Sequence, residues 1–226
     1  MGKTYQANEY RNRADQICKA VNQLCKNADG FYTESPDNKQ VSQITNLLAI
    51  LAEVTNGEEA KQLMAKLLET KDWFGQVDLF LHLYLFEAMN KTGLQDNFIP
   101  QLSEWELMKE RGMTTFAEVP LEWGEENQRS ECHPWSTAPD YFFFRTICGI
   151  KPTSAGHKTV EIAPAFGDLT SIKAVYPHNL GNIELDLKRN GMELEGSVTI
   201  PTGMNASFVW KDKKKELRAG KQNFKL

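Results

Sequence analysis

Up to about residue 150, apolar positions recur with the three- and four-residue spacing of an α-helix. Stripes of this kind lie at 5–27, 42–55, 58–70, 96–110 and 137–148. Residues 76–91 are apolar nearly all round, which predicts a helix buried on most of its sides. Amphipathic and buried helices therefore alternate, joined by short turns that contain glycine. This pattern predicts helical hairpins arranged as part of an α/α toroid or solenoid.

Beyond residue 150 the apolar positions alternate with polar ones, which is the period of a β-strand. The dipeptide Asn190-Gly191 separates two such runs and is a strong signal for a hairpin turn. We expect a small antiparallel β-sandwich over 155–226. The sequence thus predicts a multidomain α and β protein, with a helical region at 1–150 and a β-sandwich domain at 151–226.

The least regular segment, 112–139, holds the candidate chemistry. It gathers acidic residues close to aromatic ones, among them Glu118, Glu122, Trp123 and Trp135. Aromatic rings can stack on the C–H faces of sugars, while a carboxylate activates water or attacks the anomeric carbon. The combination indicates a sugar-cleaving site. An ordered acidic surface loop, anchored in the core by its tryptophans, would give the same composition.

Four short motifs follow one another along the sequence, two within this segment and two beyond it. They are GMTTFAE at 112–118, RSECHPWS at 129–136, GIKPT at 149–153 and IAP at 162–164. In their order and spacing they resemble the C-terminal region of bacterial α-L-rhamnosidases, glycoside hydrolase family 78. The resemblance extends over essentially the whole chain, from the helix that begins near residue 43 to the β-domain.

The resemblance implies a catalytic (α/α)6 barrel followed by a β-sandwich, and hydrolysis of terminal α-L-rhamnose with inversion. Such a mechanism uses two carboxyl groups about 6.5–9.5 Å apart. The family's general base corresponds to Glu118, and the histidine that contacts rhamnose corresponds to His133. Trp135 is expected to form a wall of the site because it lies so near in sequence. Trp123 and Trp73 are further substrate-binding candidates, although a tryptophan at a helix–turn–helix corner such as Trp73 more often anchors the core.

The sequence departs from the family at two points. Ala117 precedes the proposed base where many members carry tryptophan, so Glu122 remains a competing base. The acidic, tryptophan-containing segment that carries the family's general acid has no counterpart, and only about half of the barrel helices are indicated. We therefore expect a C-terminal portion of a rhamnosidase, weakly active or inactive alone. Exposed inner helix faces would then favour a homo-oligomer, or pairing with a missing N-terminal half.

Charge and composition limit the classes of partner that the chain is expected to bind. The 226 residues carry 26 basic and 30 acidic side chains, a net charge of −4, which does not favour nucleic acid. No stretch reaches the roughly 20 apolar residues of a membrane helix, and no signal peptide is indicated, so the compartment stays open. No cofactor motif or metal-ligand cluster is present in the sequence. A non-catalytic carbohydrate-binding protein and a helical interaction scaffold remain the alternatives.

Overall fold

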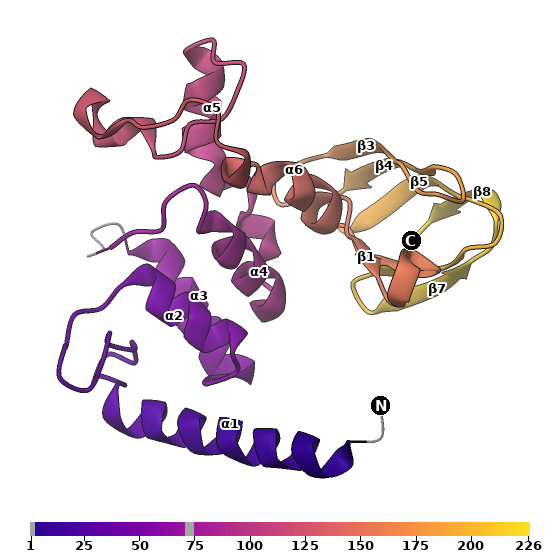
Figure 1. Cartoon of the computed structure of the whole chain (residues 1–226). Coiled ribbons are helices and arrows are strands. Elements are labelled where there is room, and N and C mark those ends of the chain that lie inside the picture. The colour runs from indigo at the N-terminus through magenta and orange to yellow at the C-terminus, as the bar shows by residue number, and fades with distance from the viewer. Residues whose placement is uncertain (1–2, 71–74) are drawn as a thin grey trace. The chain divides into compact units, whose positions relative to one another are not determined.

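The computed structural model describes residues 3–70 and 75–226, which form two compact units (Figure 1). Unit 1 comprises Met1–Leu94 and Arg111–Ser136, and unit 2 comprises Gln95–Glu110 and Thr137–Leu226. The segments 95–110 and 137–148 thus pack with the β-rich part. The boundary at residue 150 between a barrel portion and a sandwich domain stays a prediction.

Unit 1 is built from helices. They are α1 (Thr4–Leu24), α2 (Gln43–Leu51), α3 (Gly57–Glu69) and α4 (His82–Thr92), with short 3₁₀ turns η3 (Leu121–Trp123), η4 (Glu125–Asn127) and η5 (Pro134–Ser136). Helix α2 begins after Ser42, whose hydroxyl accepts a hydrogen bond from the Thr45 amide at 3.2 Å. Its stripe, including Leu47 and Ile50, is buried against α3 and α4. The predicted helical hairpins are confirmed in this region.

The helix predicted at 76–91 is shorter than its apolar pattern suggests. Residues 76–78 are irregular, residues 79–81 form a turn, and α4 begins only at His82. Asp78 explains the late start: its carboxylate accepts from the Leu81 amide at 2.9 Å, and its carbonyl accepts from the His82 amide at 3.2 Å. The apolar side chains Val77 and Leu79 are still buried, so the pattern reports burial correctly but not helix.

Helix α1 differs from its neighbours because none of its residues is buried. Tyr10, Ile17 and Leu24 are 70%, 54% and 55% exposed. Their seven-residue spacing places them on one face of the helix. This apolar stripe of the helix predicted at 5–27 is therefore open to solvent in this unit.

Unit 2 begins with short helices and continues as two sheets. The helical elements are η1 (Gln95–Asn97), η2 (Ile99–Leu102), α5 (Ser103–Glu110), α6 (Ala138–Phe142), the π-turn η6 (Phe143–Ile147) and the 3₁₀ turn η7 (Ala155–His157). The strands are β1 (Ile150–Pro152), β2 (Thr159–Ile162), β3 (Ser171–Tyr176), β4 (Ile183–Asn190), β5 (Glu193–Ile200), β6 (Asn205–Trp210), β7 (Lys213–Leu217) and β8 (Gly220–Lys225). The single helix predicted at 96–110 is thus divided, consistent with the lost amide of Pro100.

The strands form two four-stranded sheets, ordered β1-β2-β6-β7 and β3-β4-β5-β8 (Figure 1). The predicted hairpin at Asn190-Gly191 joins β4 to β5, and Gly191 has the positive φ of 59° that such a turn requires. Phe208 of one sheet and Phe224 of the other meet with ring centres 4.6 Å apart, between the two layers. A β-sandwich is therefore confirmed. One pair departs from the antiparallel expectation, because β2 runs parallel to β6.

None of the described helices is long and apolar enough to cross a membrane.

Candidate functional site

Two irregular stretches of unit 1, 115–118 and 130–133, are held side by side by backbone hydrogen bonds. The Glu118 amide donates to the Ser130 carbonyl and the His133 amide donates to the Phe116 carbonyl, both at 2.8 Å. The Thr115 hydroxyl donates to the Glu131 carbonyl and closes the far end. This pairing brings two motifs together that are separated by a loop in the sequence.

The Glu118 carboxylate lies between two nitrogen-bearing side chains. Its Oε1 is 3.4 Å from Nη1 of Arg129, and its Oε2 is 3.8 Å from Nδ1 of His133. The glutamate side chain is 26% exposed and the histidine 24% exposed, so both reach solvent. A carboxylate that reaches solvent in this way can accept a proton from a water molecule.

Aromatic rings form one side of this group. Trp135 lies on η5 and is 65% exposed. Its ring centre is 4.9 Å from that of Phe80 and 5.8 Å from that of His133, the latter in an edge-on contact. The Ser136 amide donates to the His133 carbonyl at 3.0 Å and fixes this turn. An open indole held between two rings offers a flat surface to an apolar face of a ligand.

The structure groups three of the five predicted site residues, Glu118, His133 and Trp135. Trp123 lies on η3, 37% exposed, and is not among the described contacts of that group. Glu122, the competing base, is exposed on the same turn. The candidate Trp73 lies outside the described residues. No group of three metal-ligating side chains occurs in the described part of the chain.

Sequence reasoning missed two members of the group. Arg129 belongs to the RSECHPWS motif, but only the fold shows its guanidinium next to Glu118. Phe80 was assigned to a buried helix, whereas it belongs to the turns before α4 and contacts Trp135. The motif itself could have suggested the arginine, because a cation beside a catalytic carboxylate is common chemistry. No local signal indicated the phenylalanine.

Comparison with known proteins finds similarity to one family and to several solved structures. Residues 149–225 match the family described as the bacterial alpha-L-rhamnosidase C-terminal domain. No curated protein matches the chain.

Several solved structures share the fold. The family 78 rhamnosidase of Bacillus sp. GL1 is 26% identical, with a TM-score of 0.81 over 93% of this chain and 24% of its own. The native α-L-rhamnosidase from Aspergillus terreus is 17% identical, with a TM-score of 0.79 over 99% of this chain and 28% of its own. The Streptomyces avermitilis α-L-rhamnosidase, solved with L-rhamnose, is 18% identical, with a TM-score of 0.76 over 97% of this chain and 24% of its own.

The chain therefore spans about a quarter of the length of these relatives. Residues 149–225 match the model of that C-terminal domain and the whole chain is similar in fold to solved rhamnosidases, which confirms the rhamnosidase resemblance seen in the sequence motifs.

Proposed function

We propose that this chain is part of an inverting α-L-rhamnosidase that removes terminal α-L-rhamnose from glycans or glycosides. Glu118 is the general base, and His133 and Trp135 contact the sugar. The observation that carries the proposal is the position of the Glu118 carboxylate, half-buried between Arg129 and His133. An inverting base must be ionised, reach water and stand beside the sugar.

The neighbouring aromatic group suits a deoxy sugar. Rhamnose has a methyl group and C–H faces, which pack on an indole, and hydroxyls, which hydrogen-bond to an imidazole. Trp135 and His133 offer these two surfaces in edge-on contact. A relative from Streptomyces avermitilis was solved with L-rhamnose, which supports this sugar as the ligand. Trp123 stays a candidate for a further sugar contact, as does Trp73, which lies outside the described residues.

The helices of unit 1 form part of an (α/α)6 toroid in this proposal, and the general acid comes from outside the chain. Without an acid, the leaving oxygen departs unprotonated. General acid catalysis contributes about 10²–10⁴-fold, and positioning of the substrate contributes more. The chain alone should therefore be weakly active or inactive.

The exposed face of α1 supports pairing with further toroid helices or a second copy. The apolar run at 76–91 leaves no such face, because the described side chains from Val77 to Asn90 are buried or half-buried. Tyr10, Ile17 and Leu24 instead leave an apolar stripe in solvent. Sedimentation velocity should show concentration-dependent association that an Ile17→Ser, Leu24→Ser variant reduces. A monomer at all concentrations would contradict the pairing.

The direct test measures hydrolysis of a fluorogenic aryl α-L-rhamnoside at high protein concentration, with Glu118→Gln alongside. We expect little or no turnover from either protein. Turnover in the unmodified chain that disappears in Glu118→Gln would support the base and contradict the need for an external acid. Turnover that survives in Glu118→Gln but disappears in Glu122→Gln would move the base to Glu122.

Binding of L-rhamnose tests the sugar contacts separately from catalysis. We expect saturation-transfer NMR to detect rhamnose, and Trp135→Ala and His133→Ala to weaken the signal several-fold. Trp123→Ala is the matched control, because that tryptophan is exposed but lies outside the group. The non-catalytic carbohydrate-binding alternative would be favoured by two results together. Glu118→Gln would leave rhamnose binding unchanged, and the chain would show no turnover either alone or paired with further toroid helices or a second copy. No binding at all would favour a helical interaction scaffold.

A further inference from the structure

Unit 2 contains a cavity of about 410 Å³ at the end of its sandwich where two hairpins turn. The turn from β4 to β5 and the turn from β6 to β7 form two of its sides. Residues 95–96 of η1 and the segment 163–166 after β2 form the others. Its size lies in the range of small-ligand sites, which is about 300–1,000 Å³.

Two cations line this cavity and rest against aromatic rings. The guanidinium of Arg189 lies 5.5 Å from the ring centre of Phe166, and the ammonium of Lys211 lies 5.5 Å from that of Trp210. Among the described residues, neither cation forms an ion pair with a carboxylate. The Asp96 carboxylate also lines the cavity, so two cations share it with one acid and neither cation is tied to that acid in an ion pair.

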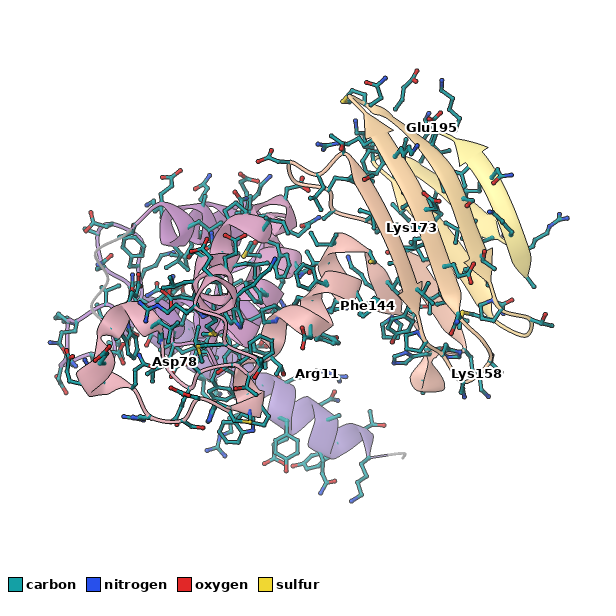
Figure 2. The ribbon with its side chains drawn as sticks, turned by 90° about the horizontal axis from the view of Figure 1, so that it is seen from above. Arg11, Asp78, Phe144, Lys158, Lys173 and Glu195 are labelled. Carbon is teal, nitrogen blue, oxygen red and sulfur yellow. The ribbon has the colours of Figure 1, made fainter. Side chains whose placement is uncertain are left out.

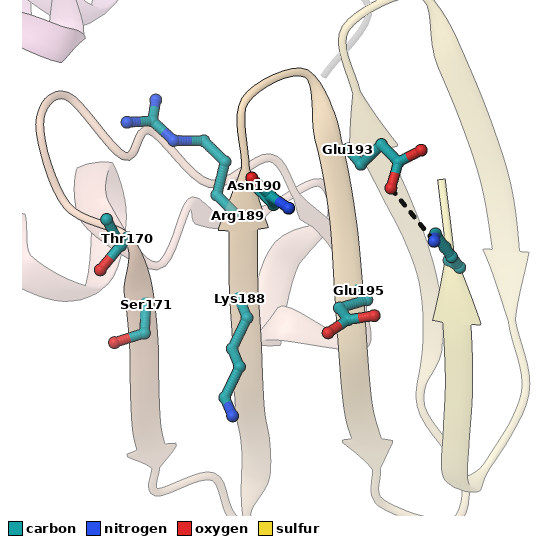
Figure 3. Close-up of a pocket in the computed structure, with 8 residues that line it drawn as sticks. Thr170, Ser171, Lys188, Arg189, Asn190, Glu193 and Glu195 are labelled. Carbon is teal, nitrogen blue, oxygen red and sulfur yellow. Dashed lines mark ion pairs between the residues drawn. The ribbon is translucent and has the colours of Figure 1, made fainter.

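The cavity on the outer face of the sheet β3-β4-β5-β8 differs in this respect, although it has a similar volume (Figure 3). There Lys225 pairs with Glu193 at 3.1 Å, and Lys188 stands opposite Glu195 in the strand register. Its lysines thus face its acids, as in an ordinary solvated sheet surface. Arg189 lines this cavity as well, so the difference between the two cavities lies in the lysines and their acidic neighbours.

The cavity between the hairpins also presents acceptors for hydroxyl groups. Oε1 of Gln95 is buried and has no hydrogen-bond partner among the described residues. The Asp96 carboxylate accepts from the Gly167 amide at 2.9 Å through one oxygen, and its side chain is exposed. A buried acceptor without a donor is costly unless a ligand or water supplies one.

Lys211 is the first residue of the two-residue turn between β6 and β7, and its φ of 54° is the positive value that tight hairpin turns use. This turn places the lysine ammonium over Trp210, near the Met192 carbonyl at 3.5 Å. Met192 is 73% exposed and provides an apolar surface at the same cavity.

We propose that this cavity binds an acidic saccharide residue, a hexuronic acid unit of a glycan. Arg189 and Lys211 receive the carboxylate, Gln95 and Asp96 accept from hydroxyls, and Met192 packs on a C–H face. The site is non-catalytic and lies in unit 2, whereas Glu118 belongs to unit 1. It would hold an acidic stretch of a glycan independently of the rhamnose-cleaving chemistry.

The test follows the indole N–H signal of Trp210 by NMR in the full chain, assigned with Trp210→Phe. This N–H donates to the Met192 carbonyl at 3.2 Å and so reports on the cavity. The probes are D-glucuronate, D-glucose and acetate, which separate the carboxylate from the hydroxyls. We expect glucuronate at tens of millimolar to shift the signal, with binding roughly tenfold tighter than for either other probe.

Three variants sharpen the result. Lys211→Asn removes the charge and suits the positive φ, so it should weaken glucuronate binding roughly tenfold while the protein stays folded. Asp96→Asn keeps an acceptor for the Gly167 amide but removes a like charge, so it should tighten binding a few-fold. Lys173→Gln is the control, since this exposed lysine on β3 carries the same charge but lies on the outer face of a sheet (Figure 2).

Each remaining outcome overturns the proposal. Equal binding of glucose would remove the role of the cations, and equal binding of acetate would reduce the cavity to an adventitious anion site. No shift of Trp210, or equal weakening by Lys211→Asn and Lys173→Gln, would also contradict it. Glu118→Gln should leave glucuronate binding unchanged, so failure here and failure of the rhamnosidase proposal can be told apart.

Discussion

Asn46 joins the first helices of unit 1, and its replacement by leucine should destabilise that unit strongly. Its side chain is fully buried on α2. Oδ1 accepts from the Tyr32 amide at 2.8 Å, while Nδ2 donates to the carbonyls of Tyr32 at 3.0 Å and Ser42 at 2.8 Å. These bonds tie the loop after α1 to the start of α2. Leucine has a similar size but can make none of them.

The magnitude follows from the number of bonds. Three buried hydrogen bonds contribute about 1 kcal/mol each, or about 3 kcal/mol together. Leaving the buried Tyr32 amide without an acceptor adds a desolvation penalty of about 1–3 kcal/mol, which the apolar leucine side chain partly offsets. We therefore expect Asn46→Leu to reduce the free energy of unfolding of unit 1 by about 3–5 kcal/mol.

Urea unfolding followed by helical circular dichroism measures this change, because the long helices lie in unit 1. With a urea dependence of about 1–3 kcal/mol per molar, the midpoint should fall by about 1–5 M. Asn56→Leu is the matched control: that exposed asparagine precedes α3 and makes no capping bond through its side chain. A loss below about 1 kcal/mol for Asn46→Leu, or equal losses for both variants, would refute the reasoning.

Three further predictions concern single groups. Burial raises the pKa of the Cys148 thiol to about 11, so at pH ~8 it should react with a disulfide reagent far more slowly than the exposed Cys132, as thiol titration would show. Gly149→Ala would place a methyl group 2.0 Å from facing backbone and should lower sandwich stability by about 2–4 kcal/mol in thermal unfolding, whereas Gly191→Ala meets no atom within 4 Å and should cost about 1 kcal/mol. Burial lowers the pKa of His82 below its usual value of 6.5, so below about pH 6.5 the unfolded chain binds more protons than the folded one. The free energy of unfolding of unit 1 should therefore fall as the pH drops below about 6.5. In urea unfolding, His82→Gln should flatten that pH profile.

The β-rich half was the more predictable part of the fold. Strict alternation identified its strands, and Asn190-Gly191 identified a hairpin, because both signals act between neighbours in sequence. The parallel pairing of β2 with β6 was not predictable in this way. These strands are far apart in the chain, and only the packing of the two sheets decides that they meet.

The helical half shows where a pattern of burial misleads. The apolar run at 76–91 predicted one long helix, yet Asp78 bonds to the backbone ahead of it and delays α4 to His82. Conversely, α1 has a helical stripe that unit 1 does not cover, since Ile17 and Leu24 stay exposed. The spacing of apolar residues indicates that the helix face they form tends to be buried. Which surface covers that face depends on the rest of the structure.

The candidate site was predictable as far as its motifs extended. Glu118, His133 and Trp135 were chosen from short motifs, and the structure brings them together. Whether they act as base and sugar contacts stays a prediction. Arg129 and Phe80 entered the group only through tertiary contacts, since neither residue's neighbours in sequence indicate its partner.

The backbone pairing of 115–118 with 130–133 has a consequence for catalysis. Every contact of Glu118 described above arises within unit 1, so the geometry of base, arginine, histidine and indole is set by that unit's own hydrogen bonds. If Glu118 is the general base, a complementary polypeptide needs to supply the acid and the remaining walls, but not to organise the base. If the chain is mixed with such a polypeptide, the activity that is restored should depend on how the acid is positioned relative to a base already in place. Substitution of Arg129, which lies beside the carboxylate, should lower the restored kcat more than substitution of Arg111, which is also exposed.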